Sequence, residues 1–290
     1  MGRTALVAAL GSLLLVPSAA GTAAPPTFPC VDIGPKPTPP TITGTPGNDT
    51  LKGTPGRDVI AGLGGDDTID GAGGNDLICG GDGNDHLVGG PGEDVISGDA
   101  GNDAVDGGSQ PRNGVDFAGY DGSPVAVKAS LATGVVTGWG SDQLTGIEGF
   151  SGSRFADSLT GDARDNVLLG QRGSDRLNGL AGSDLLSGTE GNDVMSGGRG
   201  ADLALYEHSP RSVRVNLGAG TARGWGRDRL RSIEDVVGSN RPDRLYGGSG
   251  RNYLWGLGGA DLIDGRGGRD HAFGGAGRDR CLHVEIRSSC

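Results

Sequence analysis

A nine-residue unit that recurs seven times without a gap over residues 44–106 constrains this chain more than any other feature. Its pattern is G-x-x-G-x-D-x-apolar-x, and the first unit begins at Gly44, with Asp49 at the sixth position and Leu51 at the eighth. Six residues rich in glycine and aspartate favour a turn, and the last three form a short strand with one inward apolar side chain. A repeat of this kind predicts a solenoid, in which each unit packs only on its neighbours.

Two degenerate arrays follow, and they are copies of each other at an offset of 86 residues. Tyr120 then aligns with Tyr206, and Asn166 with Asn252, where both copies replace the sixth-position aspartate by asparagine. We divide the chain into a signal peptide, a Pro/Thr-rich linker, a first array, two adaptor-plus-array copies and a tail, at residues 1–20, 21–43, 44–106, 107–201, 202–282 and 283–290.

Each copy opens with a segment outside the repeat, at residues 116–151 and 202–237. Val213, Val215 and Leu217 alternate with polar residues, which predicts a strand with one buried face, and residues 221–226 are expected to return as a second strand. We interpret both segments as structural adaptors. The alternative is a ligand groove around Trp139 and Trp225, because aromatic faces suit sugar rings.

Composition explains why such a fold needs more than a hydrophobic core. The 290 residues include 60 glycines and are only 34% hydrophobic, too little to bury the core of a compact α/β enzyme, helical bundle or TIM barrel. Residues 41–107 carry 13 acidic and 2 basic side chains. Their net charge of −11 equals the net charge of the whole chain. This stretch therefore needs a cation.

The solenoid geometry indicates where the cation binds. Two nonapeptides make one 18-residue coil of two facing parallel sheets, so that sixth-position aspartates 18 residues apart stack on one edge. Stacked carboxylates repel one another without a cation between them, and Ca²⁺ accepts carboxylate and carbonyl oxygens in flexible geometry. The predicted metal ligands are Asp49, Asp58, Asp67, Asp76, Asp85, Asp94, Asp103, Asp157, Asp175, Asp184, Asp193, Asp202, Asp243, Asp261, Asp270 and Asp279.

These units resemble the RTX, or haemolysin-type, calcium-binding repeat G-G-x-G-x-D-x-U-x. The resemblance covers residues 44–106, 152–204 and 238–282, although positions two and three often depart from the pattern, as in Thr45-Pro46 and Thr54-Pro55. It implies an all-β fold, a calcium-loaded parallel β-roll, in which the sixth-position aspartates of two stacked turns hold Ca²⁺ together with carbonyls of the glycine-rich half.

The N-terminus and the cysteines predict export. Arg3, the apolar run of residues 5–16 and the small residues up to Ala20 are typical of a secretory signal peptide, and the run is too short to span a membrane. Four cysteines in an exported chain favour disulfides and allow three pairings. We predict Cys281–Cys290, which are close in sequence, and by elimination Cys30–Cys79.

No catalytic motif accompanies the repeats. The sequence lacks H-E-x-x-H and G-x-S-x-G, and we expect no enzyme activity. The expected function is that of a secreted protein that binds Ca²⁺ and folds on export, as a structural, surface or matrix component with no nucleic-acid partner and no membrane span after signal cleavage. The alternative is a calcium-dependent carbohydrate-binding or polysaccharide-modifying accessory protein, with envelope or extracellular polysaccharide as partner.

Arginines beside the later aspartates lead to one further expectation. They occupy the fifth position at Arg251, Arg269 and Arg278, and the seventh at Arg176, Arg244 and Arg280. A guanidinium there can pair with aspartate in place of calcium and repel a divalent cation. We therefore expect the first array to bind calcium most tightly, the alternative being that these arginines point to solvent.

Overall fold

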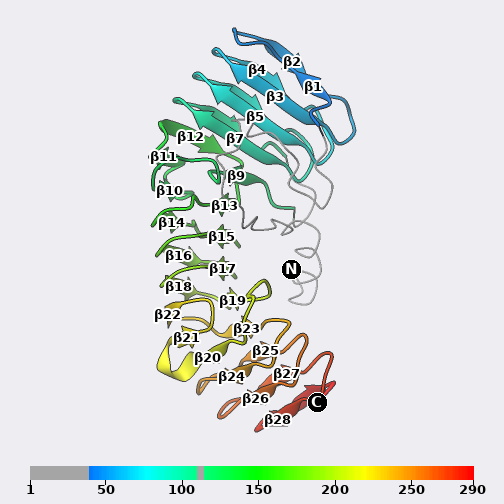
Figure 1. Cartoon of the computed structure of the whole chain (residues 1–290), viewed down its shortest axis with the longest axis vertical. Coiled ribbons are helices and arrows are strands. Elements are labelled where there is room, and N and C mark those ends of the chain that lie inside the picture. Colours follow the sequence, from blue (N-terminus) through cyan, green and yellow to red (C-terminus); the bar gives the residue numbers. More distant parts are fainter. Residues whose placement is uncertain (1–38, 110–113) are drawn as a thin grey trace. The chain divides into compact units, whose positions relative to one another are not determined.

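The computed structural model describes residues 39–109 and 114–290, which form two compact units (Figure 1). Unit 1 contains the described residues up to Gly122 together with Trp139–Ile147, and unit 2 contains Ser123–Gly138 and Glu148–Cys290. The predicted signal peptide and almost all of the linker lie outside the described residues. Within the described ranges, no helix is long and apolar enough to cross a membrane.

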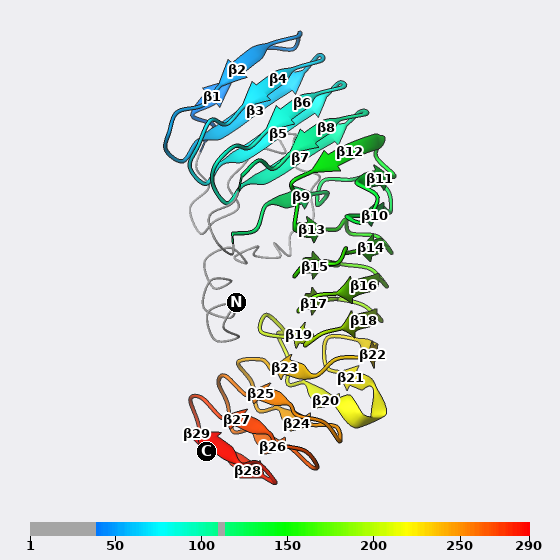
Figure 2. The same ribbon diagram turned by 180° about the vertical axis from the view of Figure 1, so that it is seen from behind.

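Unit 1 is built from two parallel sheets (Figures 1 and 2). Sheet A of this unit has the order β1 (Ile42–Thr43), β3 (Val59–Gly64), β5 (Leu77–Asp82), β7 (Val95–Ala100) and β9 (Phe117–Gly119). Sheet B has the order β2 (Thr50–Lys52), β4 (Thr68–Asp70), β6 (His86–Val88), β8 (Ala104–Asp106) and β12 (Ser141–Thr145).

Unit 2 also has two sheets, with more strands, and its sheet B includes antiparallel neighbours. Its sheet A has the order β13 (Gly149–Ser151), β15 (Val167–Leu169), β17 (Leu185–Ser187), β19 (Leu203–Leu205), β23 (Asp235–Val237), β25 (Tyr253–Trp255), β27 (His271–Phe273) and β29 (Ile286–Ser288). Its sheet B has the order β11 (Val135–Thr137), β10 (Lys128–Ser130), β14 (Ser158–Thr160), β16 (Arg176–Ala181), β18 (Val194–Arg199), β22 (Arg227–Arg231), β21 (Thr221–Arg223), β20 (Arg214–Asn216), β24 (Arg244–Tyr246), β26 (Leu262–Asp264) and β28 (Arg280–Leu282).

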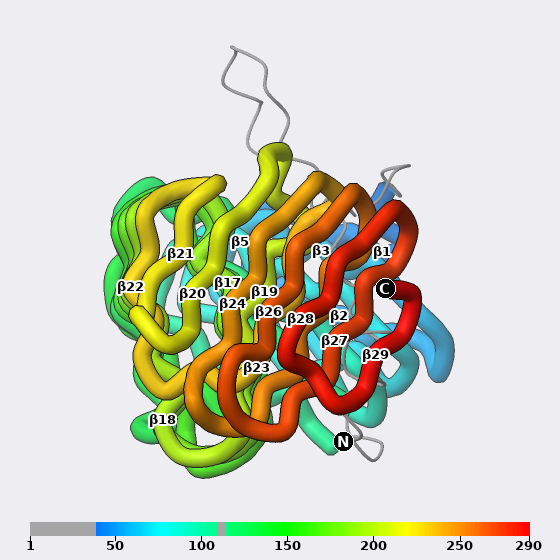
Figure 3. Tube along the Cα trace, turned by 90° about the horizontal axis from the view of Figure 1, so that it is seen from below, coloured from blue at the N-terminus to red at the C-terminus, as the bar shows by residue number. Residues whose placement is uncertain are grey.

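The strand register confirms the 18-residue coil. In unit 1, Ile60 pairs with Ile78 and Ile78 with Ile96, and in unit 2 Leu245 pairs with Ile263. The view of Figure 3 shows β24, β26 and β28 side by side in consecutive coils. Alternate nonapeptides therefore belong to alternate sheets, and the chain folds as the expected parallel β-solenoid.

One apolar side chain per nonapeptide forms a thin core between the sheets. Ile69, Ile78 and Leu87 have no exposed surface, and Phe150 and Tyr206 are the bulkiest fully buried side chains. Each coil thus buries little apolar area, and the hydrophobic effect of this core is correspondingly small.

The segments outside the repeat continue the sheets and add hairpins. Residues 202–237 contribute β19, β22 and β23 together with the antiparallel hairpin β20–β21. The predicted strand is shorter than expected, because Leu217 opens the single helical turn η1 (Leu217–Ala219) and is only half-buried. Asn216 caps that turn through its side chain, and Gly220 ends it in the left-handed region, which reverses the chain into β21.

The C-terminal disulfide is present as predicted. Cys281 and Cys290 are bonded, with their Cα atoms 5.7 Å apart. Cys79 is also disulfide-bonded. Its predicted partner, Cys30, lies outside the described residues.

Candidate metal centre

The sixth-position aspartates form hydrogen-bonded ladders along the solenoid. The backbone N–H of Asp67 donates to Oδ1 of Asp85 at 2.8 Å, and that of Asp175 donates to Oδ1 of Asp193 at 2.9 Å. The same contact joins the other sixth-position residues that lie 18 residues apart within an array, from Asp49 and Asp67 to Asp261 and Asp279, which confirms the predicted stacking. One carboxylate oxygen of each residue therefore holds consecutive coils in register.

The second carboxylate oxygen is the unusual feature of the ladders. In twelve turns, Oδ2 is buried and has no hydrogen-bond partner: Asp67, Asp76, Asp85, Asp94, Asp103, Asp175, Asp184, Asp193, Asp202, Asp261, Asp270 and Asp279. Asp94 and Asp202 have no exposed surface at all. A buried oxygen without a partner is costly, so twelve in a regular row indicate a missing ligand of positive charge.

The first glycine of each unit leaves space beside this oxygen. A Cβ atom built on Gly71 would lie 2.6 Å from Oδ2 of Asp76 and 2.6 Å from the carbonyl oxygen of Gly89. The carboxylate and the carbonyl of the next coil thus converge on one point, and only glycine keeps that point free. The same arrangement recurs at Gly179, beside Asp184 and Gly197.

Burial makes negative charge at these positions unfavourable. It raises the pKa of Asp175 to about 8 and the pKa of Asp103 to about 7, and neighbouring carboxylates raise both further. Asp76, Asp85 and Asp94 reach a pKa of about 6, again mainly through burial. A bound cation would restore the ionised form, because its field offsets desolvation.

This donor set fits Ca²⁺. Within the described ranges, no three His, Cys, Asp or Glu side chains converge on one point. An ion here would therefore be held by one or two carboxylates and by backbone carbonyls, all of them oxygen ligands, as calcium prefers.

Four other predicted ligands have a different environment. Asp49, Asp58, Asp157 and Asp243 each accept a hydrogen bond at Oδ2 from the backbone four residues earlier. Their Oδ2 atoms already have a partner without an ion.

Sequence reasoning missed several carboxylates that continue the ladders through the adaptors and into the tail. The backbone N–H groups of five ladder residues donate to these carboxylates: Asp94 to Asp116, Asp103 to Asp142, Asp193 to Asp228, Asp202 to Glu234 and Asp270 to Glu285. The alignment of the two copies pairs Asp116 with Asp202 and Asp142 with Asp228, so the 86-residue offset could have revealed Asp116, Asp142 and Asp228.

Two tyrosines close the ladders in the adaptors. The hydroxyl of Tyr120 donates to Oδ2 of Asp142 at 2.8 Å, and that of Tyr206 donates to Oδ2 of Asp228 at 3.0 Å. Both carboxylate oxygens of Asp142 and Asp228 are thereby satisfied. These positions need no cation.

The expectation that arginine pairs with the later aspartates is wrong. Arg251, Arg269 and Arg278 are exposed, and Oδ2 of Asp261, Asp270 and Asp279 in their array has no partner. Arg176, Arg244 and Arg280 are exposed too. The buried oxygens instead face the first glycines of the turns, as Oδ2 of Asp261 faces Gly256.

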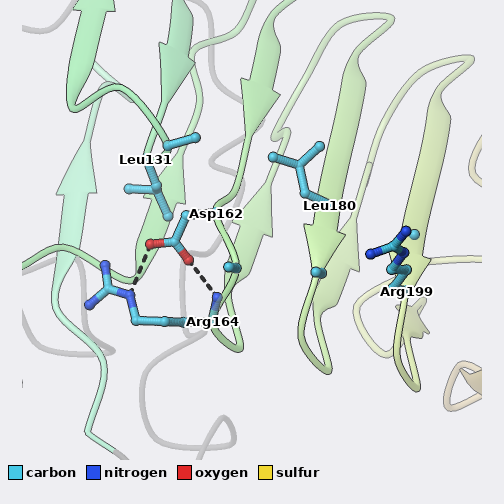
Figure 4. A pocket seen from close by; sticks show the side chains of 9 residues that line it. Leu131, Asp162, Arg164, Leu180 and Arg199 are labelled. Atoms are coloured by element: carbon cyan, nitrogen blue, oxygen red, sulfur yellow. Dashed lines mark hydrogen bonds and ion pairs between the residues drawn. The ribbon is translucent and has the colours of Figure 1, made fainter.

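A pocket on unit 2 differs from these turns. Its lining includes Leu131, Asp162, Arg164 and Leu180, and Figure 4 shows Arg164 beside Asp162. Arg164 donates to both oxygens of Asp162, at 2.7 and 2.9 Å, and this interaction lowers the pKa of the carboxyl group. The pocket therefore offers a cation no unpaired carboxylate.

Comparison with known families decides which fold family this is. The sequence model of the RTX calcium-binding nonapeptide repeat matches residues 43–78, 80–110, 151–186, 169–204, 237–272 and 246–281, together more than half of the chain. The chain belongs to this family. A search of curated proteins gave no match.

The matched ranges coincide with the solenoid coils that carry the aspartate ladders. Membership in the RTX family therefore agrees with the buried oxygens, and the chain is a β-roll protein with calcium-binding repeats. Most of each adaptor, namely residues 116–150 of the first and 205–236 of the second, lies outside the family matches.

Proposed function

We propose that this chain is a secreted, non-enzymatic protein that binds calcium through its aspartate ladders and serves as a structural, surface or matrix component. Ca²⁺ bound at the turns would supply positive charge to the buried carboxylates. The chain itself aligns the carboxylate and carbonyl oxygens, and the first glycines keep the space between them open.

The row of buried Oδ2 atoms without partners carries this proposal. A chain with so little apolar surface cannot offset the burial of twelve charged groups, so folding must depend on the ion. Secretion fits this dependence, because weak extracellular sites bind calcium in the millimolar range.

Circular dichroism tests the proposal. In chelator, the mature chain should be largely unfolded, and in ~10 mM calcium, a concentration suited to weak extracellular sites, it should become β-rich. Magnesium at the same concentration is the control, because it demands a stricter octahedral geometry. Identical spectra in chelator and in calcium would contradict the proposal.

A second candidate function, binding of an acidic polysaccharide, is favoured by a row of arginines on unit 2. Arg227 pairs in register with Arg223, Arg223 with Arg214, and Arg214 with Arg244, on the adjacent strands β22, β21, β20 and β24. All four side chains are exposed. Like charges directly opposite one another destabilise a sheet, so such a row suggests an external anion.

The first copy of the adaptor provides an internal comparison. At the positions equivalent to Arg214, Arg223, Arg227 and Arg244 it has Lys128, Thr137, Ser141 and Ser158. Three of the four charges are thus specific to the second copy. Neighbouring strands lie ~4.8 Å apart, which gives a straight row of charges suited to a linear polymer with one carboxylate per sugar.

Affinity electrophoresis in polygalacturonate, with neutral dextran as reference, tests this candidate. Replacing Arg223, Arg227 and Arg244 by the residues of the first copy (R223T, R227S, R244S) should weaken binding about tenfold, if each exposed contact contributes ~0.5 kcal/mol. R154S, R199S and R287S together remove the same charge elsewhere and should have little effect. Equal weakening by both triples, or stronger binding to a DNA oligonucleotide, would contradict it.

A further inference from the structure

The turns of the solenoid fall into two classes that differ in one hydrogen bond. In six turns, the backbone N–H of the second residue donates to the side chain of the sixth. The N–H of Thr54 donates to Oδ2 of Asp58 at 2.6 Å, and that of Ser153 to Oδ2 of Asp157, also at 2.6 Å. We call these the closed turns, and their sixth residues are Asp49, Asp58, Asp157, Asn166, Asp243 and Asn252.

The twelve turns whose Oδ2 has no partner lack this hydrogen bond, and we call them open turns. Their second residue always has a positive φ, even where it is not glycine, for example 83° at Leu63, 74° at Leu180 and 71° at Leu257. No second residue of a closed turn has a positive φ. A leucine in the left-handed region is strained, so an interaction common to the open turns must stabilise this backbone conformation.

Within each array, the closed turns come first and the open turns follow. The closed turns are the first two nonapeptides of each of the three arrays, at residues 44–61, 152–169 and 238–255. Serine or threonine occupies the second position in four of them, where its hydroxyl adds another bond to the aspartate, as Ser239 does to Asp243 at 2.8 Å.

The two asparagines that replace a sixth-position aspartate, Asn166 and Asn252, both lie in closed turns. The Nδ2 group of Asn252 donates to the carbonyl oxygen of Glu234, and that of Asn166 donates to the carbonyl oxygen of Glu148. In these turns an amide N–H thus contacts a carbonyl oxygen of the preceding coil directly. Asparagine is neutral, and its presence indicates that a closed turn requires no ionised carboxylate.

We propose that calcium binds only at the open turns, from the third nonapeptide of each array onward, and that the first two turns of each array close without an ion. The inference rests on the proposed function, since it assigns calcium to particular turns. The residue at the second position, through its backbone conformation, decides the class. The closed turns form an ion-independent start to each array on which the calcium-dependent coils stack.

Two matched substitutions in the full chain test this inference. Asp157 and Asp175 lie 18 residues apart in one ladder, and each is 1% exposed, but the first belongs to a closed turn and the second to an open turn. We expect D157N to bind as many calcium ions as the wild type, and D175N to bind about one fewer. Equilibrium dialysis with metal analysis measures the number of ions, and circular dichroism in calcium checks that each variant is folded.

The outcomes separate this inference from the proposed function. Loss of an ion in D157N, or no loss in D175N, while the wild type binds calcium, would overturn the inference alone. A wild-type chain that binds no calcium would overturn both. If D157N fails to fold, D58N paired with D76N gives the same comparison in unit 1.

Discussion

Each first-position glycine keeps a carboxylate and a carbonyl oxygen close together, and a single methyl group should prevent this. In G71A, the new Cβ would lie 2.6 Å from Oδ2 of Asp76 and from the carbonyl oxygen of Gly89. We expect a loss of stability in calcium of ~1–3 kcal/mol, as for other overpacked sites, measured by urea denaturation. G250A is the control, because a Cβ there meets no atom within 4 Å. Equal stability of G71A and the wild type would contradict this role.

The ladder-closing tyrosines allow a test of the polar network alone. Y206F removes the hydroxyl that donates to Oδ2 of Asp228 and leaves a buried oxygen without a partner. We expect a loss of ~1–3 kcal/mol of stability with no change in the number of calcium ions bound. Y246F, at a half-buried tyrosine outside the ladders, should cost much less. A change in calcium stoichiometry in Y206F would show that Asp228 also binds the ion.

Along a whole ladder, the raised pKa values combine into a pH dependence. Asp175, Asp184 and Asp193 have pKa values of about 8, 7 and 7, against 3.8 for an unperturbed group, with burial as the main cause. The folded chain therefore binds more protons than the unfolded chain from about pH 4 to about pH 8, so its stability falls as the pH rises through this range.

We accordingly expect the calcium-free chain to be more stable at about pH 5 than at about pH 8. Saturating calcium should remove most of this difference, because it replaces the protons. The β-sheet circular dichroism of the metal-free and calcium-loaded chains at both pH values measures the folded fraction, which in the metal-free chain should be larger at about pH 5. Greater stability of the metal-free chain at pH 8 would mean that the buried carboxylates are already neutralised in another way.

The two units carry the same kind of site despite their different charge. Unit 1 contains open turns at Asp76 and Asp85, and unit 2 at Asp175 and Asp184, with the same unpartnered oxygen. Because no arginine pairs with these oxygens, we expect D76N/D85N and D175N/D184N to lose equal numbers of calcium ions in equilibrium dialysis. Loss from unit 1 alone would restore the expectation that net charge determines where calcium binds.

The disulfides lie near the two ends of the chain and can be mapped directly. Non-reducing peptide mapping should yield Cys281 joined to Cys290 and Cys79 joined to Cys30, the second of which lies in the linker. Reduction of the Cys281–Cys290 bond, which closes a short loop, should lower the free energy of unfolding by ~2–4 kcal/mol. A peptide that joins Cys30 to Cys290 would contradict the assignment.

The solenoid, the 18-residue coil and the stacking of the aspartates could all be predicted from the repeat. The reason is that the period of nine residues repeats the same local rules at every turn: glycine permits the turn, aspartate caps it, and the eighth residue faces the core. Ile69 and Ile78 are buried where the repeat places them, and the ladder from Asp67 to Asp85 follows from the same spacing.

The use of each carboxylate oxygen could not be predicted from the repeat and is seen only in the folded chain. Asp58 and Asp76 are alike in the pattern, but the N–H of Thr54 contacts the first, whereas the positive φ of Ala72 leaves Oδ2 of the second without a partner. Asp228 and Glu285 join the ladders only because distant segments fold beside Asp193 and Asp270. Such choices depend on backbone orientation and on long-range contacts, which a local repeat pattern does not encode.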